Sequence, residues 1–243
     1  MIKTLIMAGG RGTRFWPVST EKKPKQYTKL FSNSSLLQDT LERVTAFSGT
    51  ESTYIVTVRN QLDLARDQGE QFLPDKNIIL EPEGRNTAPC IFYGLLKLIN
   101  DGHDPSSVVA VLPSDHVILD KSGFKKTIVA ASDLAINDQK IVTIGIIPSF
   151  PHTGYGYIQK GEKLSGGNLV KSFKEKPNHD TAKKYLDSGE YLWNAGMFIA
   201  PIGLLLKEFE KHAPEYYCHR SNLENSIHDQ ESLKSVYANL PKD

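Results

Sequence analysis

Residues 3–14 read KTLIMAGGRGTR, a short apolar segment that runs directly into a glycine-rich loop. Lys3–Met7 has the composition of a buried β-strand. The three glycines that follow allow backbone N–H groups to approach phosphate oxygens, and Arg14 can add charge-assisted hydrogen bonds. The loop is not a Walker loop, because no Gly-Lys-Ser/Thr follows, and its glycine spacing does not fit GxGxxG. Taken alone, it is as compatible with a simple tight turn as with a phosphate site.

The chain alternates between strand and helix periodicity over its first 150 residues. This alternation predicts an α/β fold with a Rossmann-like, mostly parallel sheet that is flanked by helices on both faces. The predicted strands are 3–7, 53–58, 77–80, 108–112 and 141–147, of which the last two are expected to be buried. The predicted helices are 36–47, with Ser35 as its cap, 61–72, 87–100 and 121–137.

The rhythm changes after Pro151. Short β-rich runs predict strands over 155–160, 169–174 and 193–200, with residues 161–167 as a hairpin or an insertion. Helices are predicted over 181–189, over 202–212 and through much of the polar remainder. We therefore expect one domain, 1–243, in two parts: a larger part over 1–150 and a smaller lobe over 151–243.

Composition excludes several classes of protein. The 243 residues carry 29 Lys+Arg and 28 Asp+Glu, a net charge of +1, which argues against a nucleic-acid binder that relies on bulk positive charge. No stretch approaches the roughly 20 apolar residues of a membrane span, and the N-terminal apolar run is too short for a signal peptide. Two cysteines, Cys90 and Cys218, make neither a disulfide framework nor a CxxC metal site. We expect a cytoplasmic protein without nucleic-acid or membrane partners.

Positive charge is concentrated near the N-terminus. Residues 1–30 contain seven basic groups and one acid, Glu21. This local excess suggests a small anionic ligand, although a solvated basic surface would look the same. Lys25 lies between Pro24 and Gln26, and the proline stiffens the approach to a lysine that can serve as a point charge for a polyphosphate.

Two more loops follow predicted parallel strands, at the sheet edge where such folds bind ligands. Residues 81–89 read EPEGRNTAP, in which Asn86 and Thr87 can cap the next helix. Capping does not explain Arg85, and a nucleobase edge would use such amides and backbone groups. Asp115 directly follows the strand at 108–112, where a carboxylate suits Mg²⁺, although a turn-forming aspartate also fits. We interpret His116 as structural.

A fourth group of residues falls in the smaller lobe. Gly156 permits close backbone approach, Glu175 and Asn194 can hold hydroxyls, and Lys176 can meet a second phosphate. Each of these residues, taken alone, is more often structural.

Taken together, these motifs resemble the sugar-1-phosphate nucleotidylyltransferases, and among them the mannose-1-phosphate guanylyltransferase branch. The resemblance rests on AGGRGTRFWP at 8–17, PKQ at 24–26 and the EP and RNTAP segments of 81–89. It implies transfer of GMP from GTP to α-D-mannose 1-phosphate, which gives GDP-mannose and pyrophosphate by in-line, Mg²⁺-assisted attack without a covalent intermediate. It also implies a nucleotide-binding part over 1–150, a sugar-binding part over 151–243, and the absence from this chain of the family's C-terminal region.

The resemblance assigns roles residue by residue. Three residues are implied to be catalytic, with Asp115 also holding the metal: Arg14, Lys25 and Asp115. Nucleotide binding is implied for Ala8, Gly9, Gly10, Gly12, Thr13, Arg14, Lys25, Arg85, Asn86, Thr87 and Ser114. Sugar-phosphate binding is implied for Gly156, Glu175, Lys176 and Asn194.

Two alternatives stay open from the sequence. One is a nucleotide-sugar-binding or regulatory protein of the same fold with little turnover, and the other is a nucleotidyltransferase for a different sugar 1-phosphate. A nicotinamide dehydrogenase would fit the strand–helix alternation but lacks GxGxxG and the ribose-binding acid. Whether the protein forms a homo-oligomer is not decided by the sequence.

Overall fold

The structure is a computed structural model that describes residues 2–10 and 15–241. The chain divides into two compact units. Unit 1 comprises Met1–Ile141 and Ile199–Asp243, and unit 2 comprises Val142–Phe198. No helix of the described residues is long and apolar enough to cross a membrane.

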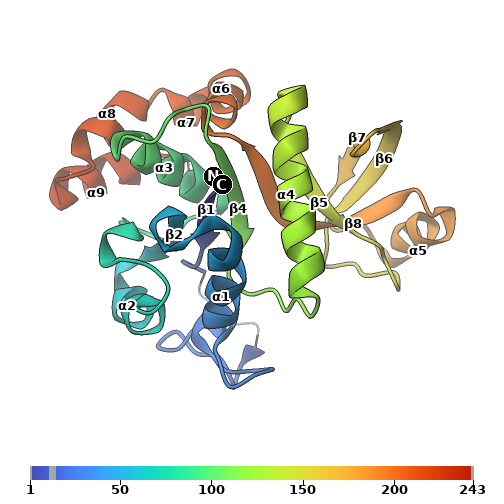
Figure 1. The fold of residues 1–243 in the computed structure, drawn as a ribbon, viewed down its shortest axis with the longest axis horizontal. Coiled ribbons are helices and arrows are strands. Elements are labelled where there is room, and N and C mark those ends of the chain that lie inside the picture. The colour runs from blue at the N-terminus through green and yellow to red at the C-terminus, as the bar shows by residue number, and fades with distance from the viewer. Residues whose placement is uncertain (1, 11–14, 242–243) are drawn as a thin grey trace. The chain divides into compact units, whose positions relative to one another are not determined.

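Unit 1 is built on parallel strands with helices between them (Figure 1). The strands are β1 (Lys3–Met7), β2 (Thr53–Val58), β3 (Ile78–Glu81) and β4 (Val108–Pro113). The helices between and after them are α1 (Leu36–Ser48), α2 (Leu62–Gly69), α3 (Thr87–Asn100) and α4 (Lys121–Asp138). Short 3₁₀ turns complete the connections: η2 (Lys25–Tyr27), η3 (Thr50–Ser52), η4 (Arg59–Gln61) and η5 (Asp75–Asn77).

The strand order places β1 in the middle of this unit. β1 pairs in parallel with β2 on one side and with β4 on the other, so that Ile6 lies opposite both Ile55 and Leu112. β2 pairs in parallel with β3, which gives the order β3-β2-β1-β4. The chain therefore runs outward from β1 to β3 and then crosses back to β4, and the order reverses between β1 and β4. Open α/β sheets bind ligands at such a reversal, beyond the carboxyl ends of the strands.

Local sequence explains these elements. Ser35 begins α1 with a capping box, because its hydroxyl accepts from the Gln38 N–H and the Gln38 side chain accepts from the Ser35 N–H. β4 is buried along most of its length, as expected for a parallel strand covered on both faces. α1 contacts α2 and α4, whereas α3 contacts α6 and α8. The predicted α/β class with a mostly parallel sheet flanked by helices is confirmed.

The C-terminal helices return to unit 1 rather than extending the smaller lobe. They are α6 (Ile202–His212), α7 (Pro214–Tyr217), α8 (Arg220–Ser226) and α9 (Gln230–Ala238), and Figure 1 shows α8 beside α3. Phe209 of α6 packs on Phe92 of α3 with ring centroids 5.0 Å apart. Unit 1 thus includes residues 199–243, because α6–α9 pack against α3 through apolar contacts. The predicted parts, 1–150 and 151–243, do not coincide with this division.

Unit 2 is a small antiparallel assembly with one helix. Its strands are β5 (Val142–Ile146), β6 (Tyr157–Leu164), β7 (Gly167–Lys174) and most of β8 (Tyr191–Pro201), and its helix is α5 (His179–Ser188). β6 pairs with β7 and with β8, both antiparallel, and β5 pairs with β8. The last residues of β8, from Ile199 on, belong to unit 1, so this strand carries the chain from unit 2 back into unit 1. Tyr157, Ala182 and Trp193 form the buried core of this unit.

One expectation for this region is corrected, and another is decided between its two alternatives. The strand predicted at 141–147 exists as β5, but it is only partly buried, because a unit with a single helix cannot cover both faces of its strands. Residues 161–167 form the hairpin that was one of the two predicted alternatives: β6 and β7 extend into them and leave a tight turn between Leu164 and Gly167.

Helix α9 is fastened to the end of β3 by a buried carboxyl group. The Tyr237 hydroxyl donates to Oε1 of Glu81, and Glu81 is 2% exposed. Arg85 lies over the Tyr237 ring and donates to the carbonyl oxygens of Ala238, Leu240 and Pro241. Burial raises the pKa of Glu81 from 4.5 to about 7, against the opposing effect of the Tyr237 hydrogen bond.

We expect this carboxyl group to lower the stability of the fold as pH rises from 4.5 to about 7. In that window the unfolded chain releases the Glu81 proton and the folded chain retains it, so the free energy of unfolding falls by up to about 3 kcal/mol. Glu81→Gln keeps an acceptor for Tyr237 and should remove this part of the pH dependence in denaturant titrations. Glu83→Gln, at an exposed neighbour, is the control; equal pH profiles for wild type and Glu81→Gln would contradict the assignment.

Candidate functional site

Three of the predicted loops meet at the edge of unit 1 where the strand order reverses. Met7 pairs with Pro113, and the Ser114 N–H donates to the Met7 carbonyl at 3.3 Å, so the loops after β1 and β4 begin side by side. A Cβ atom on Gly9 would lie 3.1 Å from Oε2 of Glu81, and one on Gly84 would lie 3.5 Å from the Gly9 carbonyl oxygen. The glycine loop, the 81–89 loop and the 113–116 loop are therefore neighbours.

Lys25 and Asp115 form an ion pair in this cluster. Their side chains are 25% and 22% exposed, so both remain within reach of solvent. The Lys25 ammonium also lies 5.7 Å from the centroid of the Phe15 ring. A cation and a carboxylate thus meet beside the glycine loop, which is the charge arrangement that a polyphosphate and its metal ion require.

Gln26 is a residue whose role the sequence did not suggest. Its side chain is 2% exposed, and its amide nitrogen donates to the carbonyl oxygens of Ala8 at 2.9 Å and Gly10 at 2.8 Å. The same nitrogen lies 3.0 Å from Oε1 of Gln61, whose own amide nitrogen donates to Gly10 at 3.3 Å. In the sequence Gln26 stands out only as part of the PKQ motif, and the motif does not predict which groups the glutamine side chain contacts.

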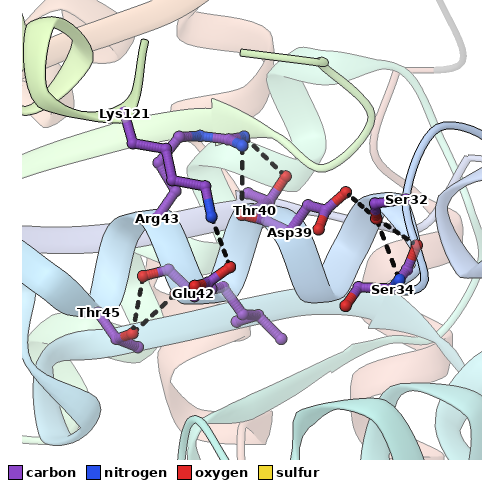
Figure 2. Close-up of polar contacts among 9 residues, drawn as sticks. Ser32, Ser34, Asp39, Thr40, Glu42, Arg43, Thr45 and Lys121 are labelled. Carbon is purple, nitrogen blue, oxygen red and sulfur yellow. Dashed lines mark hydrogen bonds and ion pairs between the residues drawn. The ribbon is translucent and has the colours of Figure 1, made fainter. Parts of the chain in front are cut away.

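Helix α1 contacts the backbone on both sides of Asp115. The Thr40 hydroxyl donates to the Ser114 carbonyl at 3.4 Å, and the buried Arg43 guanidinium donates to the His116 carbonyl at 3.4 Å. Figure 2 shows the same guanidinium reaching back to Thr40 and Asp39, which places it along the helix. These contacts restrict the peptide groups that carry the Asp115 side chain.

His116 fits the structural interpretation. Burial lowers its pKa, and the nearby charges of Arg43 and Lys25 lower it further, whereas Asp115 acts in the opposite direction. The imidazole is therefore neutral near pH 7. Among the described residues, no group of three or more His, Cys, Asp or Glu side chains lies close enough together to hold a metal ion.

The polar residues of the 81–89 loop differ in their exposure to solvent. Arg85 has only 6% of its side chain exposed, and its donors are engaged with the carbonyl groups that end α9. Asn86 occupies the N-cap position of α3 without a side-chain cap hydrogen bond, and Asn86 and Thr87 are both exposed. The side chains of Asn86 and Thr87 are thus open to a ligand, and nucleotide binding by Arg85 stays a prediction.

The predicted residues of the smaller lobe lie together within unit 2. Asn194 N–H donates to the Gly156 carbonyl at 2.8 Å, and a Cβ atom on Gly156 would lie 2.9 Å from Oε2 of Glu175. Glu175 and Lys176 form an ion pair of 2.8 Å, and each side chain is more than half exposed. Lys176 has φ of 39°, a left-handed backbone conformation that non-glycine residues seldom adopt.

Part of the predicted site lies outside the described residues, namely Gly12, Thr13 and Arg14. Ala8 is fully buried and contributes its backbone, and Gly10 is exposed. Ser114 is buried at 4% exposure.

Comparison with known proteins identifies the family. The model of the nucleotidyl transferase family matches residues 3–235. The chain belongs to this family. The resemblance inferred from its motifs is therefore confirmed at the family level.

Several relatives carry more specific names. The chain is 40% identical over 214 residues to the mannose-1-phosphate guanylyltransferase RfbM of Salmonella typhimurium, covering 88% of this chain and 44% of the relative. It is 42% identical over 211 residues to the xanthan biosynthesis protein XanB of Xanthomonas campestris pv. campestris, covering 86% and 44%. The chain thus spans about half the length of these curated relatives.

The chain is also similar to a solved structure. A protein from Thermus thermophilus described as mannose-1-phosphate geranyltransferase superposes with a TM-score of 0.89 at 32% identity. The match covers 100% of this chain and 68% of that one.

We expect the Lys25–Asp115 pair to contribute little to folding, because both groups keep contact with water. A double-mutant cycle with Lys25→Met and Asp115→Asn should give a coupling free energy of unfolding of about 1 kcal/mol or less. The Lys97–Asp101 pair has side chains that are 21% and 28% exposed and lies at the end of α3, so its cycle is a matched control. A coupling of several kcal/mol at Lys25–Asp115 alone would mean that this pair holds the fold together.

Proposed function

We propose that the chain transfers GMP from GTP to α-D-mannose 1-phosphate and so forms GDP-mannose and pyrophosphate. The observation that carries the proposal is the Lys25–Asp115 pair beside the Gly9–Gly10 turn, where the strand order reverses. The guanylyltransferase names of relatives at 40% identity over most of this chain support the choice of substrates.

The reaction needs no covalent intermediate. A phosphate oxygen of the sugar phosphate is already an anionic nucleophile, so it attacks the α-phosphorus of GTP in line. The new P–O bond forms as the bond to pyrophosphate breaks, and the electron pair leaves with pyrophosphate. Catalysis then depends on positioning and on stabilisation of charge.

Lys25 supplies the stabilisation of charge. Its ammonium group neutralises charge on the triphosphate and on the departing pyrophosphate. We propose that Arg14, from the glycine loop, adds a second cation to the same oxygens. Backbone N–H groups of the loop, including that of Gly9, complete the phosphate contacts.

Asp115 is the residue that would hold Mg²⁺. One carboxylate fits this ion, which takes one or two protein carboxylates and completes its shell with phosphate oxygens and water. When bound, the ion neutralises charge on the phosphate groups. In the structure Asp115 is paired with Lys25; with substrate bound, the carboxylate would hold the metal ion and the ammonium group would contact phosphate oxygens.

The guanine base and the sugar phosphate are bound by different groups of residues. We propose that Asn86, Thr87 and neighbouring backbone groups contact guanine, since their side chains are exposed at the start of α3. In unit 2, Lys176 contacts the sugar phosphate. Glu175 accepts hydrogen bonds from sugar hydroxyl groups, and Asn194 can accept from them or donate to them. Gly156 lets the Phe173 ring and the Glu175 carboxylate lie against its backbone, since a Cβ atom there would come within 2.7 Å of the ring and 2.9 Å of the carboxylate.

GTP should be the best nucleotide. A site that hydrogen-bonds a base edge leaves polar groups unpaired when the wrong base binds, which costs about 1–3 kcal/mol per group. The test is pyrophosphate release with four nucleoside triphosphates against several sugar 1-phosphates. Equal turnover of UTP or dTTP would overturn the base assignment, and a different preferred sugar would overturn the mannose assignment.

The same assay separates the enzyme from a binding protein of the same fold. Tight binding of GTP without pyrophosphate release from any pair of substrates would favour a nucleotide-sugar-binding or regulatory role.

Asp115→Asn should remove turnover and the response to Mg²⁺, because an amide is a poor ligand for this ion. GTP binding should survive in part, since the glycine loop and Lys25 remain. Asp120→Asn is the matched control: Asp120 is a nearby carboxylate that caps α4 through the Gly123 N–H, and asparagine caps equally well. Full activity of Asp115→Asn, or activity of the wild type without a divalent ion, would contradict the metal assignment.

A further inference from the structure

A buried pair of glutamines holds the backbone of the glycine loop. The Gln26 amide nitrogen donates to Ala8 and Gly10 carbonyl oxygens that flank Gly9, and Gln61 adds a further hydrogen bond to Gly10. Both glutamine side chains are 2% exposed. The Ala8 carbonyl also accepts from the hydroxyl groups of Tyr27 and Thr57, each at 3.4 Å. These groups come from η2, β2 and η4 and converge on one turn.

The direction of these hydrogen bonds fixes the direction of the peptide groups. A trans peptide places its C=O and N–H on opposite sides. Because the Ala8 carbonyl points toward Gln26, the Gly9 N–H of the same peptide points away from it. The Gly9 N–H is therefore presented on the side opposite the buried glutamines, which is the orientation that an anion site built from backbone N–H groups requires.

Gln26 also connects this turn to Lys25. Both residues lie in η2, a single 3₁₀ turn closed by the hydrogen bonds Tyr27 N–H to Pro24 and Thr28 N–H to Lys25, each 3.0 Å. Gln26 points into the protein and holds the glycine turn, while Lys25 pairs with Asp115. One short segment thus sets the position of the ammonium group relative to the glycine backbone.

We propose that Gln26, supported by Gln61, is a positioning residue that holds the Ala8–Gly10 backbone ready for phosphate and keeps it in register with Lys25. The inference deepens the proposed function and rests on it for the identity of the ligand. The alternative is that Gln26 satisfies buried carbonyl groups and affects only stability.

Asn77 provides a matched control for that alternative. It is a buried amide at 2% exposure that donates to three backbone carbonyl oxygens, those of Thr50, Glu51 and Thr53. These groups lie at the start of β2, whereas the candidate site lies beyond the carboxyl ends of the strands. Gln26→Met and Asn77→Leu each remove a buried amide that holds carbonyl groups, but only Gln26→Met affects the glycine turn.

The first experiment needs no ligand. Backbone amide order parameters from NMR relaxation on the whole chain should be lower at Gly9 and Gly10 in Gln26→Met than in wild type or Asn77→Leu. Order parameters at the glycine turn that are unchanged in Gln26→Met, relative to the rest of β1, would overturn the positioning role whatever the function of the protein.

The second experiment measures binding of GTP and of inorganic pyrophosphate by calorimetry, together with KM and kcat. Loss of one or two hydrogen bonds that orient the turn should weaken both ligands about tenfold or more and raise KM for GTP. A purely structural role lowers the folded fraction and hence the apparent kcat, with KM and the dissociation constants unchanged. Unchanged constants in Gln26→Met would therefore overturn the proposal.

Two further variants guard these tests. If Gln26→Met does not fold, Gln61→Leu removes the outer support and should change the same quantities in the same direction by a smaller factor; no change there would count against the proposal. Gln26→Leu is a second apolar variant that removes the donor, so it should behave as Gln26→Met does. Failure of the wild-type chain to bind either ligand would refute the proposed function, and the relaxation experiment would still decide whether Gln26 holds the turn.

Discussion

Parallel pairing of β1 with two neighbours is the constraint on which the site depends. With β2 on one side and β4 on the other, the segments that follow β1 and β4 must emerge at the same edge of the sheet. No local preference of a glycine or an aspartate could bring Gly9 and Asp115 together across more than a hundred residues. The apolar side chains of the central strands, which are fully buried at Ile6, Ile55 and Val111, supply the energy for this arrangement.

Polar groups then refine what the strands bring together. The glycine turn is held from beneath by amide side chains, the Asp115 loop is held by α1, and the 81–89 loop is held by α9. In each case a buried donor meets backbone carbonyl oxygens, which would otherwise lose their hydrogen bonds with water. The side chains of this site that remain in contact with solvent are those of Lys25, Asp115, Asn86 and Thr87.

Sequence periodicity predicted the elements well and their association less well. β1, β2, α3 and α6 have the predicted bounds, because apolar spacing and capping are local properties. The division of the chain was not predictable in the same way. Contacts such as Phe92 with Phe209 decide that α6–α9 lie with α3, and they join residues more than a hundred positions apart. For the site, residue chemistry indicated the loops, but Gln26 and Arg85 are defined by the carbonyl groups they meet, and these follow from the fold.

The short distance between the Gly9 backbone and the Glu81 carboxyl group makes several positions depend on one another, because a Cβ atom at position 9 would lie 3.1 Å from Oε2 of Glu81. A side chain at 9 would press on the Glu81 carboxyl group, and that group is bonded to Tyr237 of α9. Replacement of any one of these three residues changes which side chains are tolerated at the other two positions. Across related sequences, positions 9, 81 and 237 should therefore covary as a set, although 156 residues separate Glu81 from Tyr237. The buried acid therefore favours a glycine at position 9 independently of any ligand.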